Sequence, residues 1–249
     1  MMGMLLWKSP EEGKQEKRMA LTERSVLHMR FACVEVVRGP KTPSAVLRRR
    51  VASAAKKLHR AGVTRAVLPT DFPFSAELEK YGVRPVSTLP LRRALAAETV
   101  GWRLERLGLT AGARVAVVGE QLTGELVRTV TELCLRCRYV LLDLPYGGEE
   151  LSRQLRREYG VSLLLGPSKE QLEGAEALVL FGERQDLNRK NPVVLALYEG
   201  GGDALPPLVL PPAMEERLPA GCDRPQLLSA LREAGALRPG QISLGTSKG

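Results

Sequence analysis

Aromatic residues are scarce in this chain, which has 249 residues and only 4% Phe, Trp and Tyr. Proteins that hold single-stranded nucleic acid stack bases on aromatic rings, so this composition disfavours such a function. No apolar run approaches the roughly 20 residues of a membrane span. The run Met4-Leu5-Leu6-Trp7 is followed by charged residues and not by a signal-peptide cleavage site. We therefore expect a cytoplasmic protein with no membrane partner.

Cysteine is also rare, with four residues in the whole chain. Four cysteines do not make a disulfide scaffold and suit a reducing compartment. Cys134 and Cys137 form a C-x-x-C motif at the C-terminal end of a predicted helix, whereas redox motifs depend on a helix N-terminus to lower the thiol pKa. Cys33 and Cys222 show no paired spacing, so we expect no metal site and interpret the motif as two small core residues.

What the chain has in abundance is positive charge in its first half. Residues 1–110 contain 21 Lys and Arg against 10 Asp and Glu, a net charge of +11. Residues 111–249 contain 16 against 18, a net charge of −2. This asymmetry predicts a domain boundary near Ala111 and places any anion-attracting surface in the first half.

Residues 1–28 are predicted to be a disordered tail, because they are rich in Lys, Glu, Gln and Met without a sustained apolar period. Met29 precedes the first convincing strand, so a translation product that starts there is expected to lose little structure. Residues 29–110 are predicted to form a small basic α/β domain. Its expected strands are 30–37 and 63–68, and its expected helices are 43–61, 75–81 and 91–107.

The helix predicted over 43–61 is strongly basic. Leu47, Val51, Ala54 and Leu58 repeat at helical spacing and predict its buried stripe. The other faces carry only cations among their charged residues: Arg48, Arg49, Arg50, Lys56, Lys57 and Arg60. Such a face indicates binding to nucleic acid or to an anionic membrane surface, or else an ordinary solvated surface.

Residues 111–249 show a regular alternation of apolar strands with helical patterns. Continuous Val, Leu and Ala strands between helices are typical of a parallel sheet buried on both faces. The predicted fold class is therefore α/β, a Rossmann-like doubly wound parallel sheet preceded by the small α/β domain. The expected strands are 114–118, 138–142, 161–165, 177–181, 193–198 and 207–210, and the expected helices are 122–136, 148–159, 168–173 and 224–234.

The first strand of this half ends in a loop that resembles a dinucleotide fingerprint. In G-x-G-x-x-G, the first glycine makes the tight turn, the second lets the backbone approach the pyrophosphate, and the third allows close helix–strand packing. Gly119 and Gly124 occupy the first and third places, but Gln121 occupies the second. Glu120 adds a negative charge beside the expected phosphate. Asp143 lies 19 residues after Gly124, near the place of the acid that binds a ribose hydroxyl.

On these residues, 111–200 resemble the NAD(P)-binding Rossmann domain family. The loop is similar to the corresponding turn in glutamyl-tRNA reductases and shikimate dehydrogenase-like proteins, where the middle position is normally glycine. The resemblance implies a dinucleotide or other small ligand at the carboxyl ends of the strands, where glycine-containing turns follow. The cofactor is unknown; if it is a dinucleotide, the Asp143 carboxylate favours NAD over NADP because it repels a 2′-phosphate. The implied cofactor-binding residues are Gly119, Glu120, Gln121, Leu122, Thr123, Gly124 and Asp143.

Residues that could transfer a proton are sparse, since 111–249 contain no histidine. Asp71, Lys169, Asp186 and Tyr198 could serve, but their spacing singles out none of them. Three functions stay open: a non-catalytic nucleotide-sensing or partner-binding module, an NAD(P)-dependent oxidoreductase with an atypical phosphate loop, and a nucleic-acid-binding protein that uses the basic helix.

Overall fold

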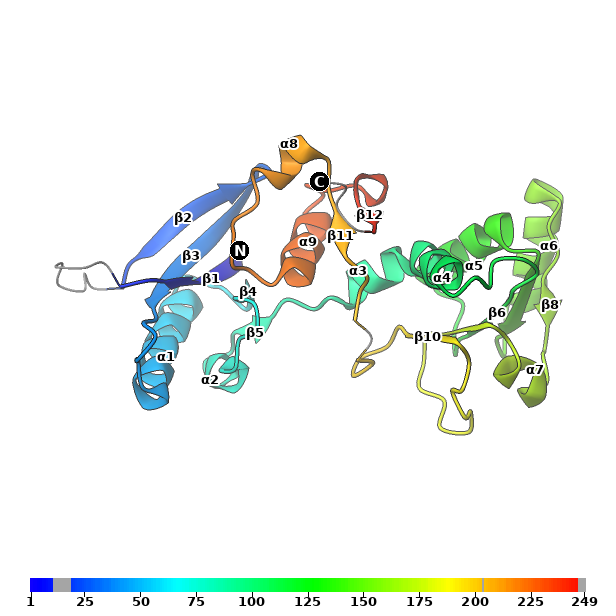
Figure 1. Ribbon diagram of the computed structural model, residues 1–249, viewed down its shortest axis with the longest axis horizontal. Helices are drawn as coiled ribbons and strands as arrows, with labels where there is room; N and C mark the ends of the chain where they lie inside the picture. Colours follow the sequence, from blue (N-terminus) through cyan, green and yellow to red (C-terminus); the bar gives the residue numbers. More distant parts are fainter. Residues whose placement is uncertain (11–18, 203, 246–249) are drawn as a thin grey trace. The chain divides into compact units, whose positions relative to one another are not determined.

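The computed structural model describes residues 1–10, 19–202 and 204–245, and the chain divides into two compact units (Figure 1). Unit 1 consists of Met1–Thr88 and Leu210–Ile242. Unit 2 consists of Leu89–Val209 and Ser243–Gly249. Unit 1 is therefore built from two segments that are far apart in the sequence.

Unit 1 contains a five-stranded sheet in the order β2-β3-β1-β4-β5. Strand β2 is antiparallel to β3, and the other neighbouring strands are parallel. The strands are β1 (Met2–Lys8), β2 (Leu21–Val26), β3 (Met29–Val37), β4 (Arg65–Val67) and β5 (Arg84–Pro85). The helices are α1 (Ser44–Arg60), α2 (Ser75–Glu79), α8 (Pro212–Glu215) and α9 (Arg224–Glu233), with a 3-10 turn at Pro239–Gln241.

Strand β1 lies in the middle of this sheet, so the prediction of a disordered tail over 1–28 is wrong for residues 2–8 and 21–26. Met4 and Leu5 are fully buried and Leu6 is 7% exposed. Strand β1 pairs with β3 on one side along its whole length and with β4 on the other. A strand buried on both faces requires an apolar run without alternation, as in β1. This run is too short to show a period in the sequence. Residues 11–18 of the predicted tail lie outside the described residues.

Helix α1 follows the prediction for 43–61. Its buried residues include all four members of the predicted stripe, and its outer residues carry the cations. The helix begins after Pro43, whose fixed φ suits a helix start. Gly62 follows its end with φ +74, a conformation that costs glycine little.

The C-terminal segment of unit 1 docks through α9. The Asp223 side chain accepts the Gln226 N–H at 2.9 Å and caps the helix. The Gln226 side chain in turn accepts the Leu68 N–H at 3.0 Å, and Arg65 pairs with Glu233 at 2.7 Å. Helix α9 therefore belongs to unit 1, while α3 (Leu89–Ala94) and α4 (Ala96–Arg106) belong to unit 2. The predicted boundaries 29–110 and 111–249 are wrong because contacts more than 150 residues apart in sequence leave no local signal.

Unit 2 contains a five-stranded parallel sheet in the order β10-β9-β6-β7-β8. Numbered within the unit and read from the other edge, this is 3-2-1-4-5, the classic Rossmann order 3-2-1-4-5-6 without its sixth strand. The predicted Rossmann-like α/β fold is confirmed. The strands are β6 (Arg114–Val118), β7 (Tyr139–Asp143), β8 (Leu164–Leu165), β9 (Ala177–Leu180) and β10 (Val193–Ala196). A separate antiparallel pair joins β11 (Leu208–Val209) to β12 (Ser243–Leu244).

Both faces of the unit 2 sheet are buried. One face packs against α4, α5 (Gly124–Arg136) and α6 (Gly148–Tyr159). The other face packs against α7 (Lys169–Glu173), Ala175 and Leu187. The helix predicted over 91–107 is two helices, α3 and α4, divided at Leu95. Alternate residues of β6 thus enter two different cores, which fixes the loop that follows β6 at the end of the sheet.

Candidate functional site

A pocket of about 310 Å³ lies at the carboxyl ends of β6, β7 and β9. The chain reverses its direction of winding between β6 and β9, because β7 and β8 lie on one side of β6 and β9 and β10 on the other. Such switch points are where open α/β sheets bind ligands. The turns that follow β6, β7 and β9 all contribute to the pocket. Its lining residues are Val118, Gly119, Glu120, Asp143, Pro145, Gly182 and Arg184.

Asp143 and Arg184 form the charged wall of the pocket. Arg184 Nη1 donates to Asp143 Oδ2 at 2.6 Å. The same guanidinium donates from Nε and Nη2 to the two carboxylate oxygens of Asp186, at 2.7 and 2.9 Å. The two carboxylates, Asp186 first, hold the pKa of Arg184 above its usual value. Arg184 is therefore fixed by Asp186 and occupies one oxygen of Asp143, which leaves Oδ1 for another donor.

Glu120 extends from the end of β6 across the backbone of Gly182. A Cβ built on Gly182 would lie 2.9 Å from Glu120 Oε1 and 3.1 Å from its Cδ. A side chain at 182 would displace this carboxylate from its present position. The sequence does not single out Gly182 or Arg184, because their partners Glu120 and Asp143 lie 62 and 41 residues upstream.

The seven residues of the predicted cofactor site are not all at the pocket. Gly119, Glu120 and Asp143 line it. Gln121 is exposed, and its carbonyl accepts the Thr123 N–H at 3.0 Å. Leu122 packs on Gly147, where an added Cβ would lie 2.9 Å from Leu122 Cδ2. Gly124 begins α5.

The glycines of the loop have different roles from those of the fingerprint. A Cβ on Gly119 would lie 2.4 Å from Leu126 Cδ1 of helix α5, so the first glycine provides the close strand–helix packing. A Cβ on Gly124 would meet nothing within 4 Å. The expected packing role of the third glycine is therefore wrong. Gln121 has no positive φ, so its backbone does not require glycine.

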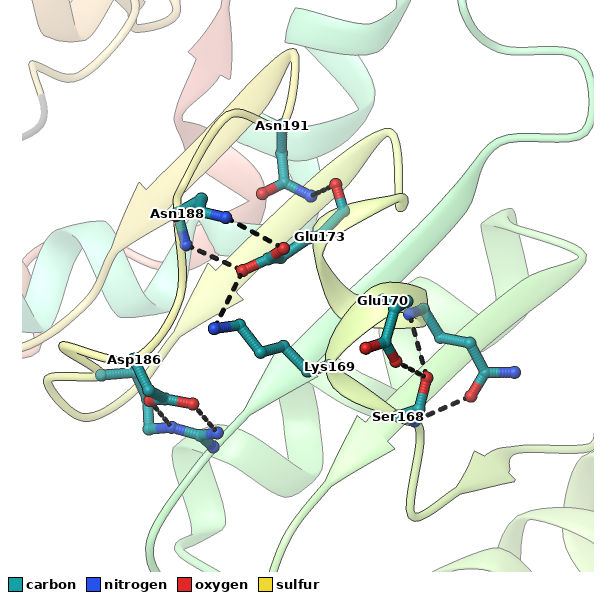
Figure 2. A network of polar contacts seen from close by, with 9 residues as sticks. Ser168, Lys169, Glu170, Glu173, Asp186, Asn188 and Asn191 are labelled. Carbon is teal, nitrogen blue, oxygen red and sulfur yellow. Dashed lines mark hydrogen bonds and ion pairs between the residues drawn. The ribbon is translucent and has the colours of Figure 1, made fainter.

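A twelve-residue loop without a helix joins β9 to β10, and Figure 2 shows polar contacts that tie this loop to its surroundings. The Glu173 carboxylate accepts the Asn188 backbone N–H at 3.0 Å and its side-chain amide at 3.1 Å. Asn191 donates to the carbonyls of Leu172 and Ala175 at 2.9 and 2.8 Å. This network ties the loop that carries Arg184 to α7 and to the residues just after it.

The four residues considered for proton transfer do not come together. Lys169 pairs with Glu173 at 3.7 Å, and Asp186 pairs with Arg184 (Figure 2). The Tyr198 hydroxyl accepts a hydrogen bond from Arg189 at 2.9 Å. Asp71 belongs to unit 1. None of the four lines the pocket.

The C-x-x-C motif has the properties of packing residues. Cys134 is buried, and burial raises the pKa of its thiol to about 12. Burial also raises the pKa of Cys137. Within the described parts of the chain, no group of three or more His, Cys, Asp or Glu side chains is arranged to hold a metal ion. The same parts contain no helix with the length and apolarity to cross a membrane.

We expect the pKa of Asp186, lowered to about 2 by the Arg184 hydrogen bonds, to rise toward its usual value near 4 in Arg184→Gln. The lowered pKa means that this pair stabilises the folded state above about pH 4 and that the stabilisation is lost as the pH falls toward 2. A carbon-detected NMR titration of the Asp186 carboxyl measures the midpoint. Lys190→Gln, an exposed cation in the same loop, is the control, and an unchanged midpoint in Arg184→Gln would contradict the pairing.

No protein-family model matches this chain, and no curated protein matches its sequence. Several solved structures are similar to it in fold. L-tryptophan dehydrogenase from Nostoc punctiforme is 14% identical, with 59% of this chain and 44% of that chain covered and a TM-score of 0.28. Ornithine carbamoyltransferase from Pyrococcus furiosus is 18% identical, with 60% and 50% covered and a TM-score of 0.27.

Hetero-hexameric glutamate dehydrogenase from Thermus thermophilus is 17% identical, with 84% of this chain and 62% of that chain covered and a TM-score of 0.33. The chain thus spans about half of the length of the first two structures and somewhat more of the third. The fold assignment rests on the strand order of unit 2, and these likenesses add no argument about ligand or reaction.

Proposed function

We propose that unit 2 binds a ribonucleoside or ribonucleotide in the pocket at the ends of β6, β7 and β9, and that binding rather than turnover is its role. The observation that carries the proposal is the position of Asp143. It ends β7 inside a pocket at the switch point of a Rossmann sheet, where an acid accepts hydrogen bonds from ribose hydroxyls. Its Oδ1 atom remains for that purpose beside the Arg184 contact at Oδ2.

A sensing or partner-binding role is supported by the placement of the polar side chains. Lys169 and Tyr198 pair with residues that do not line the pocket, and Asp186, itself outside the lining, is held by Arg184. Proton transfer needs a group within hydrogen-bond reach of the reacting atom. The groups in the pocket lining that could transfer a proton are the Glu120 and Asp143 carboxylates, and Asp143 is already held by Arg184.

Asp143→Asn is expected to weaken adenosine binding about tenfold, because an amide replaces a charged acceptor in one hydrogen bond. Thermal shift with adenosine, NAD, NADH and NADP measures binding, since a ligand of the native state raises its stability. Asp186→Asn is the matched control, because Asp186 is an exposed acid that also binds the Arg184 guanidinium but does not line the pocket. No shift with any of the four ligands at millimolar concentration would overturn the proposal.

An NAD(P)-dependent oxidoreductase is the second candidate, favoured by the Rossmann strand order and by Asp143. The residues fit only part of a dinucleotide: Asp143 suits a ribose, but the Glu120 carboxylate lies in the pocket near the expected pyrophosphate. The expected preference for NAD over NADP rests on the Asp143 carboxylate. Arg184 already offsets the charge of that carboxylate, which weakens its repulsion of a 2′-phosphate. A thermal shift with NAD and NADP larger than with adenosine would favour this candidate.

A third candidate, an anionic partner at α1, is supported by charge. Unit 1 has 21 Lys and Arg against 12 Asp and Glu, whereas unit 2 has 16 of each, so the whole net charge of +9 belongs to unit 1. Among the described residues, Arg49 and Arg60 have no acidic partner, and Lys56 lies over the Tyr81 ring at 5.3 Å. The apolar face of α1 is buried in the core, so the helix cannot insert it into a membrane. Nucleic acid is the partner that this surface suits best.

Duplex DNA binding is expected to fall steeply as salt rises, because each phosphate contact releases counterions. Arg49→Glu and Lys56→Glu together should abolish it at 150 mM salt and reduce the slope of log affinity against log salt. Fluorescence anisotropy measures both quantities. Arg24→Glu, an exposed cation on β2 outside α1, is the control. Binding that does not depend on salt, or that survives the double change, would remove this candidate.

A further inference from the structure

The N-terminus of α5, which follows the loop after β6, is capped by a side chain of its own loop. Anions bind at helix N-termini because the first backbone N–H groups have no partner within the helix. In α5, the Thr123 hydroxyl accepts the Leu126 N–H at 3.3 Å, and the Thr123 carbonyl accepts the Val127 N–H at 2.9 Å. The first turn also carries Glu125, whose carboxylate is held by Arg93 at 2.7 Å. This helix start is therefore capped by its own side chain and is flanked by an acid.

A carboxylate lines the pocket at the loop where the fingerprint would place a phosphate. Glu120 lines the pocket and lies against Gly182, with Oε1 within 2.9 Å of the position of a Cβ there. Among the described residues, no hydrogen bond or ion pair engages the Glu120 side chain. Asp143, Glu125 and Asp186 in the same region all have an arginine partner. Glu120 is thus the uncompensated charge of the pocket.

The charges that line the pocket sum to −1. Glu120 and Asp143 are each negative, and Arg184 is positive. Arg184 cannot easily turn to a ligand phosphate, because three of its hydrogen bonds already go to Asp143 and Asp186. A ligand with a positive group beside Glu120 would make the lining neutral, whereas a phosphate there would raise the local negative charge.

We infer that the pocket takes a ribonucleoside whose 5′ substituent is cationic, with the ribose hydroxyls on Asp143 and the cation on Glu120. The inference rests on the proposed function, since it assumes a ribonucleoside at Asp143. A pocket of about 310 Å³ lies at the low end of the range for small-molecule sites, which suits a nucleoside better than a dinucleotide. The site therefore discriminates ligands by the charge of the 5′ substituent.

Isothermal titration calorimetry at pH 7 tests the preference for a cationic 5′ substituent. The three probes share one nucleoside: 5′-amino-5′-deoxyadenosine, adenosine and 5′-AMP. The amino nucleoside should bind most tightly, at least tenfold more tightly than 5′-AMP. Glu120→Gln should reduce that ratio to within about threefold, because loss of the carboxylate weakens binding of the cationic amino nucleoside and strengthens binding of 5′-AMP. Glu183→Gln, a neighbouring exposed acid that does not line the pocket, should leave the ratio unchanged.

The outcomes separate this inference from the proposed function. Tighter binding of 5′-AMP than of the amino nucleoside would overturn the inference and leave ribose binding in place. A ratio that Glu120→Gln does not change would also overturn it, because the selectivity would then come from another group. Failure of all three probes to bind would overturn both the inference and the proposed function.

Discussion

A chain that starts at Met29 is expected to lose the fold of unit 1. It would lack β1, which supplies hydrogen-bonding partners to β3 on one side and β4 on the other. Met4, Leu5 and Leu6 are buried, and burying each such side chain contributes about 1.5–3 kcal/mol. Their loss removes roughly 5–9 kcal/mol, which is comparable to the whole stability of a typical domain. The expectation from the sequence that such a product loses little structure is therefore wrong.

Hydrogen exchange followed by mass spectrometry measures this effect. In the shortened chain, the backbone amides of β3 and β4 should exchange at the rate of an unfolded segment, because their protection depends on the sheet. The amides of α5 provide an internal reference, since that helix belongs to the core of unit 2. Protection of β3 that survives removal of residues 1–28 would contradict the central role of β1.

Replacing Gly119 with alanine is expected to destabilise unit 2 by about 1–3 kcal/mol, the usual cost of an extra carbon in a packed site. The added Cβ would lie 2.4 Å from Leu126 Cδ1 and 3.4 Å from Leu144 Cδ1. Leu126 is fully buried, so it has no free space into which to move. The strand or the helix must therefore shift.

The same substitution at Gly124 is expected to stabilise the protein by up to about 1 kcal/mol. A Cβ there meets nothing within 4 Å, and alanine loses less backbone entropy than glycine in a helix. Chemical denaturation of the two variants gives the comparison, with the midpoint and slope fitted separately. Equal destabilisation by both would show that the glycines act as the fingerprint predicts, and would contradict the packing described for Gly119.

The architecture of unit 2 could be predicted because its signals are local. The apolar run Val115–Val118 and the amphipathic pattern over 148–159 mark β6 and α6 with the correct bounds. The short strand β8 is a partial exception: 161–165 was expected, and only Leu164–Leu165 pairs. A two-residue strand at the edge of the sheet has too few residues to show its limits.

The charged wall of the pocket could not be predicted, since it depends on residues that meet only in the fold. Asp143 was found from its distance to the glycines, but its partner Arg184 lies 41 residues further along the chain. Glu120 was recognised as a charge near the loop, yet its position on Gly182 required the adjacency of β6 and β9. The same limit explains why α9 was assigned to the wrong domain.

The two-segment construction of unit 1 sets an order of events during synthesis. Its first segment ends at Thr88, and α9 begins at Arg224, so residues 89–223 are translated in between. At roughly 5–20 residues per second, this takes on the order of ten seconds. Throughout that interval the Leu68 N–H and carbonyl lack Gln226 and Asp223 as partners. Nearly all of unit 2 leaves the ribosome before unit 1 can close, so a nascent-chain experiment should detect a folded Rossmann sheet first.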